Sequence, residues 1–340
     1  MALSFAWHVY DMLQFARGAN WTSLTTSDVP GTDLREKWII ISGSNNGVGL
    51  EAAKSFAAWG ANLILACREP PEWERRPEDA VKECREIARE KGHTSIIEWW
   101  ELDMASLANV EAFCSRWLQS NRVLDVLCNN AGIADRPVGI PILTTDGFEM
   151  IHQVRYSPDN EPRIVCTSSC THYVGCFDPD HANGEPGMKG NYYPNNKLYL
   201  LMWVIEMQSR FLKHPEYLHI TINAVHPGYV NTGIWVAVDE IEILWFSRII
   251  QYLRPYTAIT PQQGSLALTH AATSPEFGPD PSKQHIGSPN GRGGGKYINR
   301  IWEASPKSCC RDPDARAKLW SKVAEELHLH EKGLLDGLGF

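Results

Sequence analysis

Tyr193 and Lys197 lie four residues apart in this chain of 340 residues, and Ser169 precedes them. If residues 192–211 form a helix, both side chains share one face, because Cβ atoms at this spacing lie about 5–6 Å apart. The Lys197 ammonium can then lower the pKa of the Tyr193 phenol from its ordinary value of about 10. Such a phenol can donate a proton to a carbonyl oxygen. The same spacing also occurs by chance on exposed helices, so the pair is weighed with the rest of the chain.

A glycine-rich turn closes the first apolar strand, residues 38–41. Gly43, Gly47 and Gly49 lie in this turn, and a helix follows it to about residue 59. Glycines let the backbone approach a pyrophosphate, whose negative charge the helix N-terminus stabilises. The turn therefore predicts a dinucleotide site, although one such motif alone is also typical of an ordinary tight turn.

Apolar strand-like segments alternate with helical segments along most of the chain, which is typical of a parallel sheet with helices on both faces. Strands are expected at residues 38–41, 62–66, 96–102, 123–128, 163–167, 220–225 and 296–299. Apolar residues at 107, 110, 113, 114, 117 and 118 predict an amphipathic helix between the third and fourth strands. We expect an α/β protein with a doubly wound parallel sheet (Rossmann fold). Residues 36–330 would form a single domain, with an N-terminal extension at 1–35 and a tail at 331–340.

The overall charge and cysteine pattern exclude several classes of protein. A net charge of -8 without a basic stripe argues against nucleic-acid binding. Nine cysteines without metal-ligand spacing indicate reduced thiols, no metal site and a cytoplasmic location. Charged residues interrupt residues 1–21, so no apolar run there is long enough to span a bilayer. We expect them to pack on the domain surface, with loose membrane contact as the alternative.

The order of the motifs carries a family resemblance. The Gly-x-x-x-Gly-x-Gly turn is followed by Asn129-Asn130-Ala131-Gly132 after the fourth strand and then by Ser169 and Tyr-x-x-x-Lys. This series resembles the short-chain dehydrogenase/reductase family over roughly residues 36–327. Retinol-dehydrogenase-type and fungal secondary-metabolism members look most similar in Ala66-Cys67-Arg68, Leu102-Asp103, Arg163-Ile164-Val165, Ser168-Ser169 and His226-Pro227-Gly228.

The resemblance implies a role for each residue of the site. Tyr193 would be the acid/base, Lys197 would lower its pKa and hold the nicotinamide ribose, and Ser169 would donate a hydrogen bond to the substrate oxygen. Ser168 is the competitor of Ser169. The implied cofactor-binding residues are Gly43, Asn45, Asn46, Gly47, Val48, Gly49, Arg68, Asp103, Asn129, Ala131, Gly132, Tyr193, Lys197, Pro227, Gly228, Val230 and Thr232.

The end of the second strand predicts which cofactor is used. An NAD enzyme has an acidic residue there for the ribose hydroxyls, whereas this chain has Cys67 and Arg68. An arginine can hold a 2′-phosphate, which predicts NADP(H). The alternative is that Arg68 pairs with Glu69. For Asp103, implied to contact the adenine, the alternative is a helix cap. The nearby His172 is expected to be a loop or packing residue, as is His226.

The segment between the fourth and fifth strands is short. Where the family has a long helix carrying a catalytic Asn, residues 155–162 form a polar, proline-flanked stretch, and Asn160 is a poor substitute. A crossover needs only about a dozen residues, so strand five can still be reached. We expect the shortened helix to uncover apolar surface on one sheet face. Dimer formation through this helix is therefore in doubt, and the oligomeric state is left open.

These observations predict an NADP(H)-dependent oxidoreductase that interconverts a ketone or aldehyde and an alcohol on a hydrophobic small molecule. The apolar, aromatic stretch at residues 233–259, where the family has its substrate-covering loop, favours a lipid-like or polyketide-like substrate. An amphipathic helix packed on the core explains the same stretch. The alternative function is a cofactor-binding family member with weak or no activity, because the helix that carries the Asn is incomplete.

Overall fold

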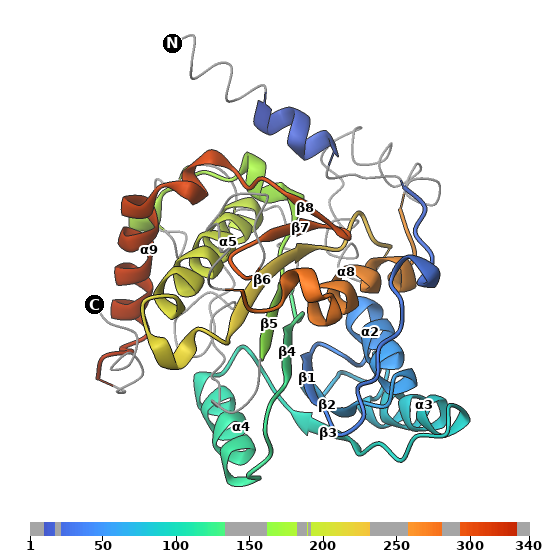
Figure 1. Ribbon diagram of the computed structural model, residues 1–340. Helices are drawn as coiled ribbons and strands as arrows, with labels where there is room; N and C mark the ends of the chain where they lie inside the picture. Colours follow the sequence, from blue (N-terminus) through green and yellow to red (C-terminus); the bar gives the residue numbers. More distant parts are fainter. Residues whose placement is uncertain are drawn as a thin grey trace.

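The structure is a computed structural model that describes residues 10–17, 22–132, 162–181, 189, 192–231, 258–280 and 293–331. Within these residues, strands and helices alternate around one central sheet, as Figure 1 shows. The expected α/β doubly wound fold is confirmed. The boundaries at residues 36 and 330 stay predictions.

The described residues form a sheet of eight strands in the order β3-β2-β1-β4-β5-β6-β7-β8. The strands are β1 (Trp38–Ser42), β2 (Asn62–Cys67), β3 (Ile97–Glu101), β4 (Val126–Asn129), β5 (Arg163–Thr167), β6 (Thr221–His226), β7 (Tyr297–Asn299) and β8 (Trp302–Ala304). The first seven are parallel and lie at the seven predicted places. The eighth, which the sequence analysis missed, pairs with β7 in antiparallel orientation.

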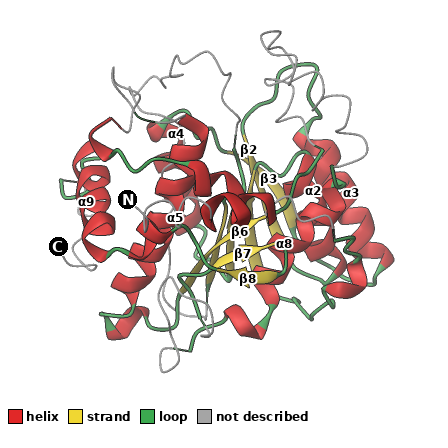
Figure 2. Ribbon diagram, turned by 90° about the horizontal axis from the view of Figure 1, so that it is seen from above, coloured by secondary structure: helices red, strands yellow, loops and turns green. Residues whose placement is uncertain are grey.

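Helices cover both faces of the sheet. They are α2 (Gly47–Ala58), α3 (Pro77–Glu90), α4 (Leu107–Gln119), α5 (Tyr192–Phe211), α8 (Pro261–Thr273) and α9 (Pro313–Glu326). In the view from above (Figure 2), α4, α5 and α9 lie on one side of the strands and α2, α3 and α8 on the other. Alternate strand residues supply the two cores: Ile40 and Ile64 face the first group of helices, and Ile39 and Ile41 face the second.

The helix α4 illustrates how local sequence sets these layers. Ser106 caps its N-terminus by accepting a hydrogen bond from the Asn109 amide at 3.2 Å. Val110, Phe113 and Trp117 are buried, as the apolar periodicity predicts. Leu118 is 59% exposed, so its expected place in the buried stripe is wrong. Leu118 is the next residue after the buried Trp117, and one step along a helix turns the side chain by about 100°, here toward solvent.

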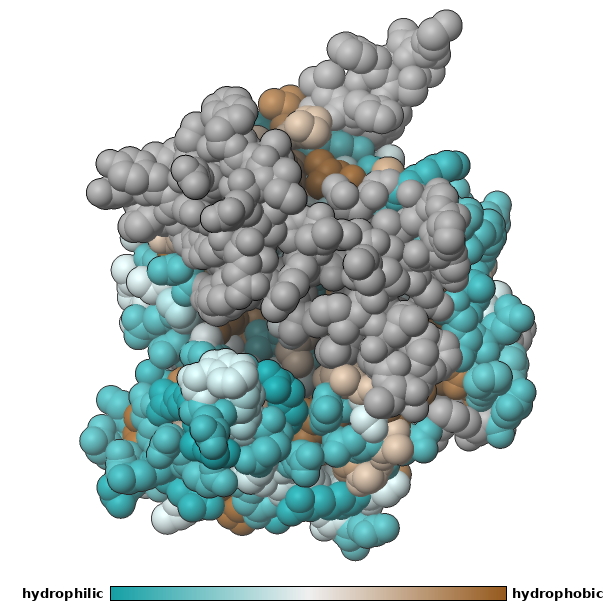
Figure 3. Space-filling model, turned by 180° about the vertical axis from the view of Figure 1, so that it is seen from behind, coloured by the Kyte–Doolittle hydropathy of each residue, from teal (hydrophilic) through white to brown (hydrophobic). Residues whose placement is uncertain are grey.

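The sheet face beside the shortened crossover is buried, contrary to our expectation. The strands β4 and β5 are parallel neighbours, so the crossover does reach the fifth strand. Leu127 and Ile164 are 3% and 8% exposed. The exposed large apolar side chains among the described residues lie outside β1, β4 and β5: Met12, Leu13, Trp73, Ile96, Leu118, Val174 and Trp302. Residues 155–161 of the shortened segment, including Asn160, lie outside the described residues. The face of the molecule seen in Figure 3 is mainly hydrophilic where it is described.

Residues 10–17 of the N-terminal extension form a helix that touches the domain. Phe15 packs against the larger core, and Asp11 is 7% exposed. Met12 and Leu13 point outward. Across the described parts of the chain, no helix combines the length and the apolar character needed to cross a membrane.

Candidate active site

The motif residues gather where the strand order of the sheet reverses. The strand β1 lies between β2 and β4, so the strand order reverses beside it, which is where open α/β sheets bind their ligands. The glycine turn follows β1, Asn129-Asn130-Ala131-Gly132 ends β4, and Ser168-Ser169 follows β5. Motifs that lie far apart in the sequence thus meet at the carboxyl ends of the strands, because these strands are adjacent and parallel.

Close packing explains two glycines of the turn. Gly43 has a φ of 63°, and a Cβ there would lie 2.9 Å from the Cα of Ala131. A Cβ on Gly49 would lie 2.4 Å from the Gly43 carbonyl oxygen and 2.5 Å from the amide nitrogen of Asn130. Both contacts are too short for any side chain, so only glycine fits at either position.

Asn130 fixes the turn against the fourth and fifth strands. Its Nδ2 donates to the carbonyl oxygens of Ser42 and Gly43, both at 3.1 Å, and its Oδ1 accepts from Thr167 Oγ1 at 3.4 Å. The Ser42 hydroxyl accepts from the backbone amides of Asn130 and Ala131, both at 3.0 Å. Asn130 belongs to the Asn129-Asn130-Ala131-Gly132 motif, but no role was expected for it from the sequence. Its position after a strand adjacent to β1 was the signal that could have found it.

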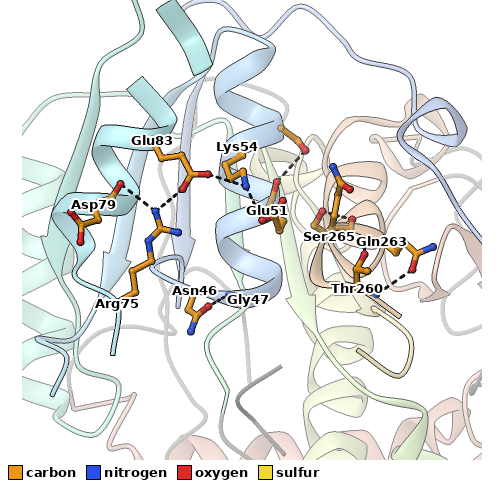
Figure 4. A network of polar contacts seen from close by, with 12 residues as sticks. Asn46, Gly47, Glu51, Lys54, Arg75, Asp79, Glu83, Thr260, Gln263 and Ser265 are labelled. Carbon is orange, nitrogen blue, oxygen red and sulfur yellow. Dashed lines mark hydrogen bonds and ion pairs between the residues drawn. The ribbon is translucent and has the colours of Figure 1, made fainter. Parts of the chain in front are cut away.

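The helix α2 begins at this turn, and Figure 4 shows its surroundings. Asn46 Oδ1 accepts from the Gly47 amide at 2.7 Å (Figure 4). Asn45 Nδ2 donates to the Arg75 carbonyl at 3.1 Å. Val48 is buried in the core. Asn46 therefore caps the helix, and Asn45 ties the turn to the segment that precedes α3.

Ser169, Tyr193 and Lys197 come together across β5 and α5. Ser169 is 7% exposed and begins the 3-10 helix η2 (Cys170–Val174), where its Oγ accepts from the Thr171 amide at 3.2 Å. Its side chain also forms a hydrogen bond with Tyr193. Lys197 Nζ lies 5.5 Å from the centre of the Tyr193 ring and donates to the Thr167 carbonyl at 3.0 Å. A Cβ on Gly132 would lie 3.8 Å from the same ammonium.

The pKa of Tyr193 departs from our expectation. Burial raises it from 10.0 to about 12, and the hydrogen bond from Ser169 opposes this only in part. Our expectation of a Tyr193 pKa below its ordinary value is therefore wrong. Burial disfavours the charged phenolate more than the hydrogen bond from Ser169 favours it. Tyr193 is therefore a neutral proton donor at pH 7.

Two buried polar atoms beside these groups have no hydrogen-bond partner within the described residues. They are Oγ of Ser168 and Oδ1 of Asn129. Asn129 Nδ2 is directed to Cys166 Sγ at 3.8 Å. Ser168, the competitor for the catalytic role, is 2% exposed, whereas Ser169 is the serine that bonds to Tyr193.

The other expected cofactor residues lie around this edge. Arg68 follows β2 and donates to Glu74 Oε1 at 2.8 Å, so the expected alternative partner Glu69 is wrong, since Glu69 pairs with Arg76 instead. Asp103 Oδ1 accepts from the Ala105 amide at 2.9 Å in the turn before α4. The Ser106 side chain occupies the cap itself.

The segment after β6 is described only in part. Pro227 and Gly228 follow the strand, and Gly228 packs against the aliphatic part of Arg300. Val230 is buried and bridges to Ile259. Thr232 and most of the aromatic stretch at 233–259 lie outside the described residues. Within the described ranges, His, Cys, Asp and Glu form no group of three that could hold a metal ion.

Solved structures with a similar fold agree with this arrangement. A putative uncharacterized protein from Mycobacterium paratuberculosis superposes with a TM-score of 0.59 at 21% identity, over 90% of this chain and 98% of that one. An NADH-dependent reductase A1-R' complexed with NAD gives 0.50 at 20% identity, over 75% of this chain and 93% of that one. At such identities these likenesses show the fold alone.

Sequence comparison identifies the family. The family model described as short chain dehydrogenase matches residues 37–156. Retinol dehydrogenase 14 of Homo sapiens is 31% identical over 264 residues, which are 72% of this chain and 76% of that protein. The WW domain-containing oxidoreductase of Danio rerio is 28% identical over 87% of this chain and 69% of its own length. The chain belongs to the short-chain dehydrogenase/reductase family of oxidoreductases.

The family prediction and its retinol-dehydrogenase side are therefore confirmed. No comparison bears on the fungal secondary-metabolism side, which stays a prediction. The roles of the individual site residues likewise remain proposals.

Proposed function

We propose that the protein is an NADP(H)-dependent oxidoreductase that interconverts a ketone or aldehyde and an alcohol on a hydrophobic small molecule. The observation that carries this proposal is the approach of Ser169, Tyr193 and Lys197 to one another beside the glycine turn. A proton donor, a hydrogen-bond donor and a cation are the groups that carbonyl reduction needs around the substrate oxygen.

The residues present fit a dinucleotide. The turn at Gly43 and Gly49 leaves no room for side chains, and the N-terminus of α2 suits a pyrophosphate. The buried Oδ1 of Asn129, without a partner in the described part of the chain, is available to a ribose hydroxyl. When bound, the nicotinamide supplies or accepts a hydride. Asp103, Ala131, Gly132, Pro227, Gly228, Val230 and Thr232 would complete the cofactor site.

The protein's own residues handle the proton. Tyr193 is neutral at pH 7, since burial raises a pKa that already lies well above 7, and it therefore carries a proton that it can donate to the substrate oxygen as negative charge develops there. Ser169 donates a second hydrogen bond to that oxygen. Lys197, held at the Thr167 carbonyl, stabilises the phenolate that results and binds the nicotinamide ribose.

The preference for NADP(H) rests on Arg68. It follows β2 where an acidic residue would favour NAD, and its side chain is 52% exposed and within reach of a ligand. The substrate class rests on the relatives, which include retinol dehydrogenase 14 and a polyprenol dehydrogenase of Homo sapiens. Their names indicate long apolar alcohols. A polyketide-like substrate remains a further prediction from the sequence.

The test combines cofactor binding with turnover. NADPH and NADH are titrated by calorimetry, and NADPH oxidation is followed with a panel of long-chain aldehydes, retinal-like aldehydes and cyclic ketones. Lys197→Met, which removes the ammonium and keeps the length of the side chain, should lose turnover on every substrate of the panel. No binding of either dinucleotide would refute the proposed function.

A second candidate is a family member that binds the cofactor without turning over substrate. The family match ends at residue 156, inside the segment where the helix carrying the catalytic Asn is shortened. NADPH binding with no turnover across the panel would favour this candidate.

A further inference from the structure

His172 is a buried histidine three residues after the proposed catalytic serine. It is 0% exposed, and its two ring nitrogens meet two backbone groups. Nδ1 lies 2.7 Å from the Ser169 carbonyl oxygen, and Nε2 lies 3.4 Å from the backbone nitrogen of Lys307. The ring therefore joins the catalytic serine to a segment 135 residues further along the chain.

These partners fix the protonation of the ring. A carbonyl oxygen can only accept a hydrogen bond, so Nδ1 carries the proton and donates it to Ser169. A backbone N–H can only donate, so Nε2 is unprotonated and accepts from Lys307. The neutral tautomer satisfies both contacts, and burial, which lowers the pKa of His172 to about 3, keeps the ring neutral at pH 7.

The segment at residues 305–307 holds the rest of η2 as well. Lys307 Nζ donates to the carbonyls of Tyr173 at 2.9 Å and Gly175 at 2.8 Å. The Tyr173 hydroxyl donates to the Ser305 carbonyl. The imidazole also packs between two aromatic rings, with its centre 4.0 Å from that of Tyr173 and 4.5 Å from that of Tyr297.

The continuation of this segment is anchored to the helix that carries Tyr193 and Lys197. The carbonyl of Cys310, in the 3-10 helix η8 (Ser308–Arg311), accepts from Arg316 Nη1 at 3.0 Å. Arg316 Nε in turn donates to Glu206 Oε2 on α5 at 3.2 Å. The chain from residue 305 to 316 thus contacts both elements of the proposed catalytic site, and α5 and α9 lie side by side in Figures 1 and 2.

We propose that His172 is a positioning residue, which, together with residues 305–307, fixes the Ser169 backbone so that the serine hydroxyl meets Tyr193 and the substrate oxygen. This inference rests on the proposed function, because it assumes that the Ser169 hydroxyl acts in turnover. A histidine that only fills the core would make the same contacts, so the test must separate the two roles.

A double-mutant cycle makes that separation. His172→Phe keeps an aromatic ring but removes both hydrogen bonds, and kcat should fall by roughly 10- to 100-fold, the loss expected for a catalytic group misplaced by about 1 Å. The Kd for NADPH should stay the same. In a Ser169→Ala background the same replacement should change kcat by less than about 2-fold, because no hydroxyl is left to position. An equal loss in both backgrounds would overturn the proposal.

Two further variants control for folding. His172→Asn, whose amide N–H can occupy the place of Nδ1, should recover most of kcat, and failure to do so in a folded protein would count against the proposal. His270→Phe removes another partly buried histidine, on α8, which packs against Phe277 on the opposite sheet face. It should leave kcat unchanged.

A spectroscopic measurement tests the two contacts on which the proposal depends even if the protein proves inactive. In ¹⁵N-histidine NMR spectra, the resonance lost in His172→Asn should show a protonated Nδ1 and an unprotonated Nε2. It should not titrate between pH 8 and pH 5. The opposite tautomer, or a titration near the ordinary histidine pKa, would overturn the inference, while absent NADPH binding would separately refute the proposed function.

Discussion

Replacing Arg68 with Ala is expected to weaken NADPH binding far more than NADH binding. The guanidinium stands at the end of β2 and is paired with Glu74 at 2.8 Å, with 52% of the arginine side chain exposed. NADPH carries a 2′-phosphate that NADH lacks. Only the 2′-phosphate can compete with the Glu74 carboxylate for the Arg68 guanidinium. The loss of affinity in Arg68→Ala should therefore be specific to NADPH.

The size of the effect follows from two opposing contributions. A hydrogen bond between charged groups contributes roughly 1.5–3 kcal/mol. Releasing an exposed ion pair such as Arg68 with Glu74 costs about 0–1 kcal/mol. The difference is roughly 0.5–3 kcal/mol, which corresponds to a loss in NADPH affinity of roughly 2- to 150-fold.

Calorimetric titration of both cofactors at one fixed ionic strength measures this difference. Arg35→Ala is the matched control, because Arg35 also forms an exposed pair, with Asp33, but lies before β1, at the opposite end of the strands from Arg68. Glu74→Gln should raise the NADPH affinity by up to about 5-fold, since the arginine no longer has to be released from a carboxylate. Equal losses of NADPH and NADH affinity in Arg68→Ala would refute the reasoning.

Three other changes test the site and the fold. Tyr193→Phe should lower kcat by roughly 10²–10⁴-fold while NADPH still binds, and retained turnover would assign the proton transfer to another group. Burial lowers the pKa of His172 from 6.5 to about 3. Below pH 6.5 this histidine is therefore protonated in the unfolded chain but not in the folded chain. The free energy of unfolding then falls by up to about 1.4 kcal/mol per pH unit as the pH decreases. The melting temperature of His172→Asn should therefore fall less steeply than that of the unchanged protein between pH 7 and pH 5, and parallel curves would contradict this. Inserting a family-like helix with its Asn after Val154 should raise turnover by restoring the proton relay. The melting temperature should rise little, because the neighbouring sheet face is already buried. Equal NADPH oxidation by both forms would show that the short segment is tolerated.

The sequence by itself determined the strands of the parallel sheet, the glycine turn and the pairing of Tyr193 with Lys197. These features are local. A strand needs a short apolar run, the turn needs glycines next to that run, and residues four apart on a helix share a face whatever surrounds them. The fold followed from their order along the chain, because β-α alternation leaves few topologies.

Only the tertiary structure decided which side chains form ion pairs, which are buried, and which form long-range hydrogen bonds. Arg68 forms its ion pair with Glu74 rather than with Glu69. The short strand β8 is held by its antiparallel pairing with β7. The sequence placed Lys197 near Tyr193, but the pKa of the phenol depends on the burial of its ring, which raised it to about 12. The contact of His172 with Lys307 joins residues 135 positions apart, and no spacing rule reaches across that distance. Desolvation and long-range hydrogen bonds exist only after the layers have packed, so they had to be observed.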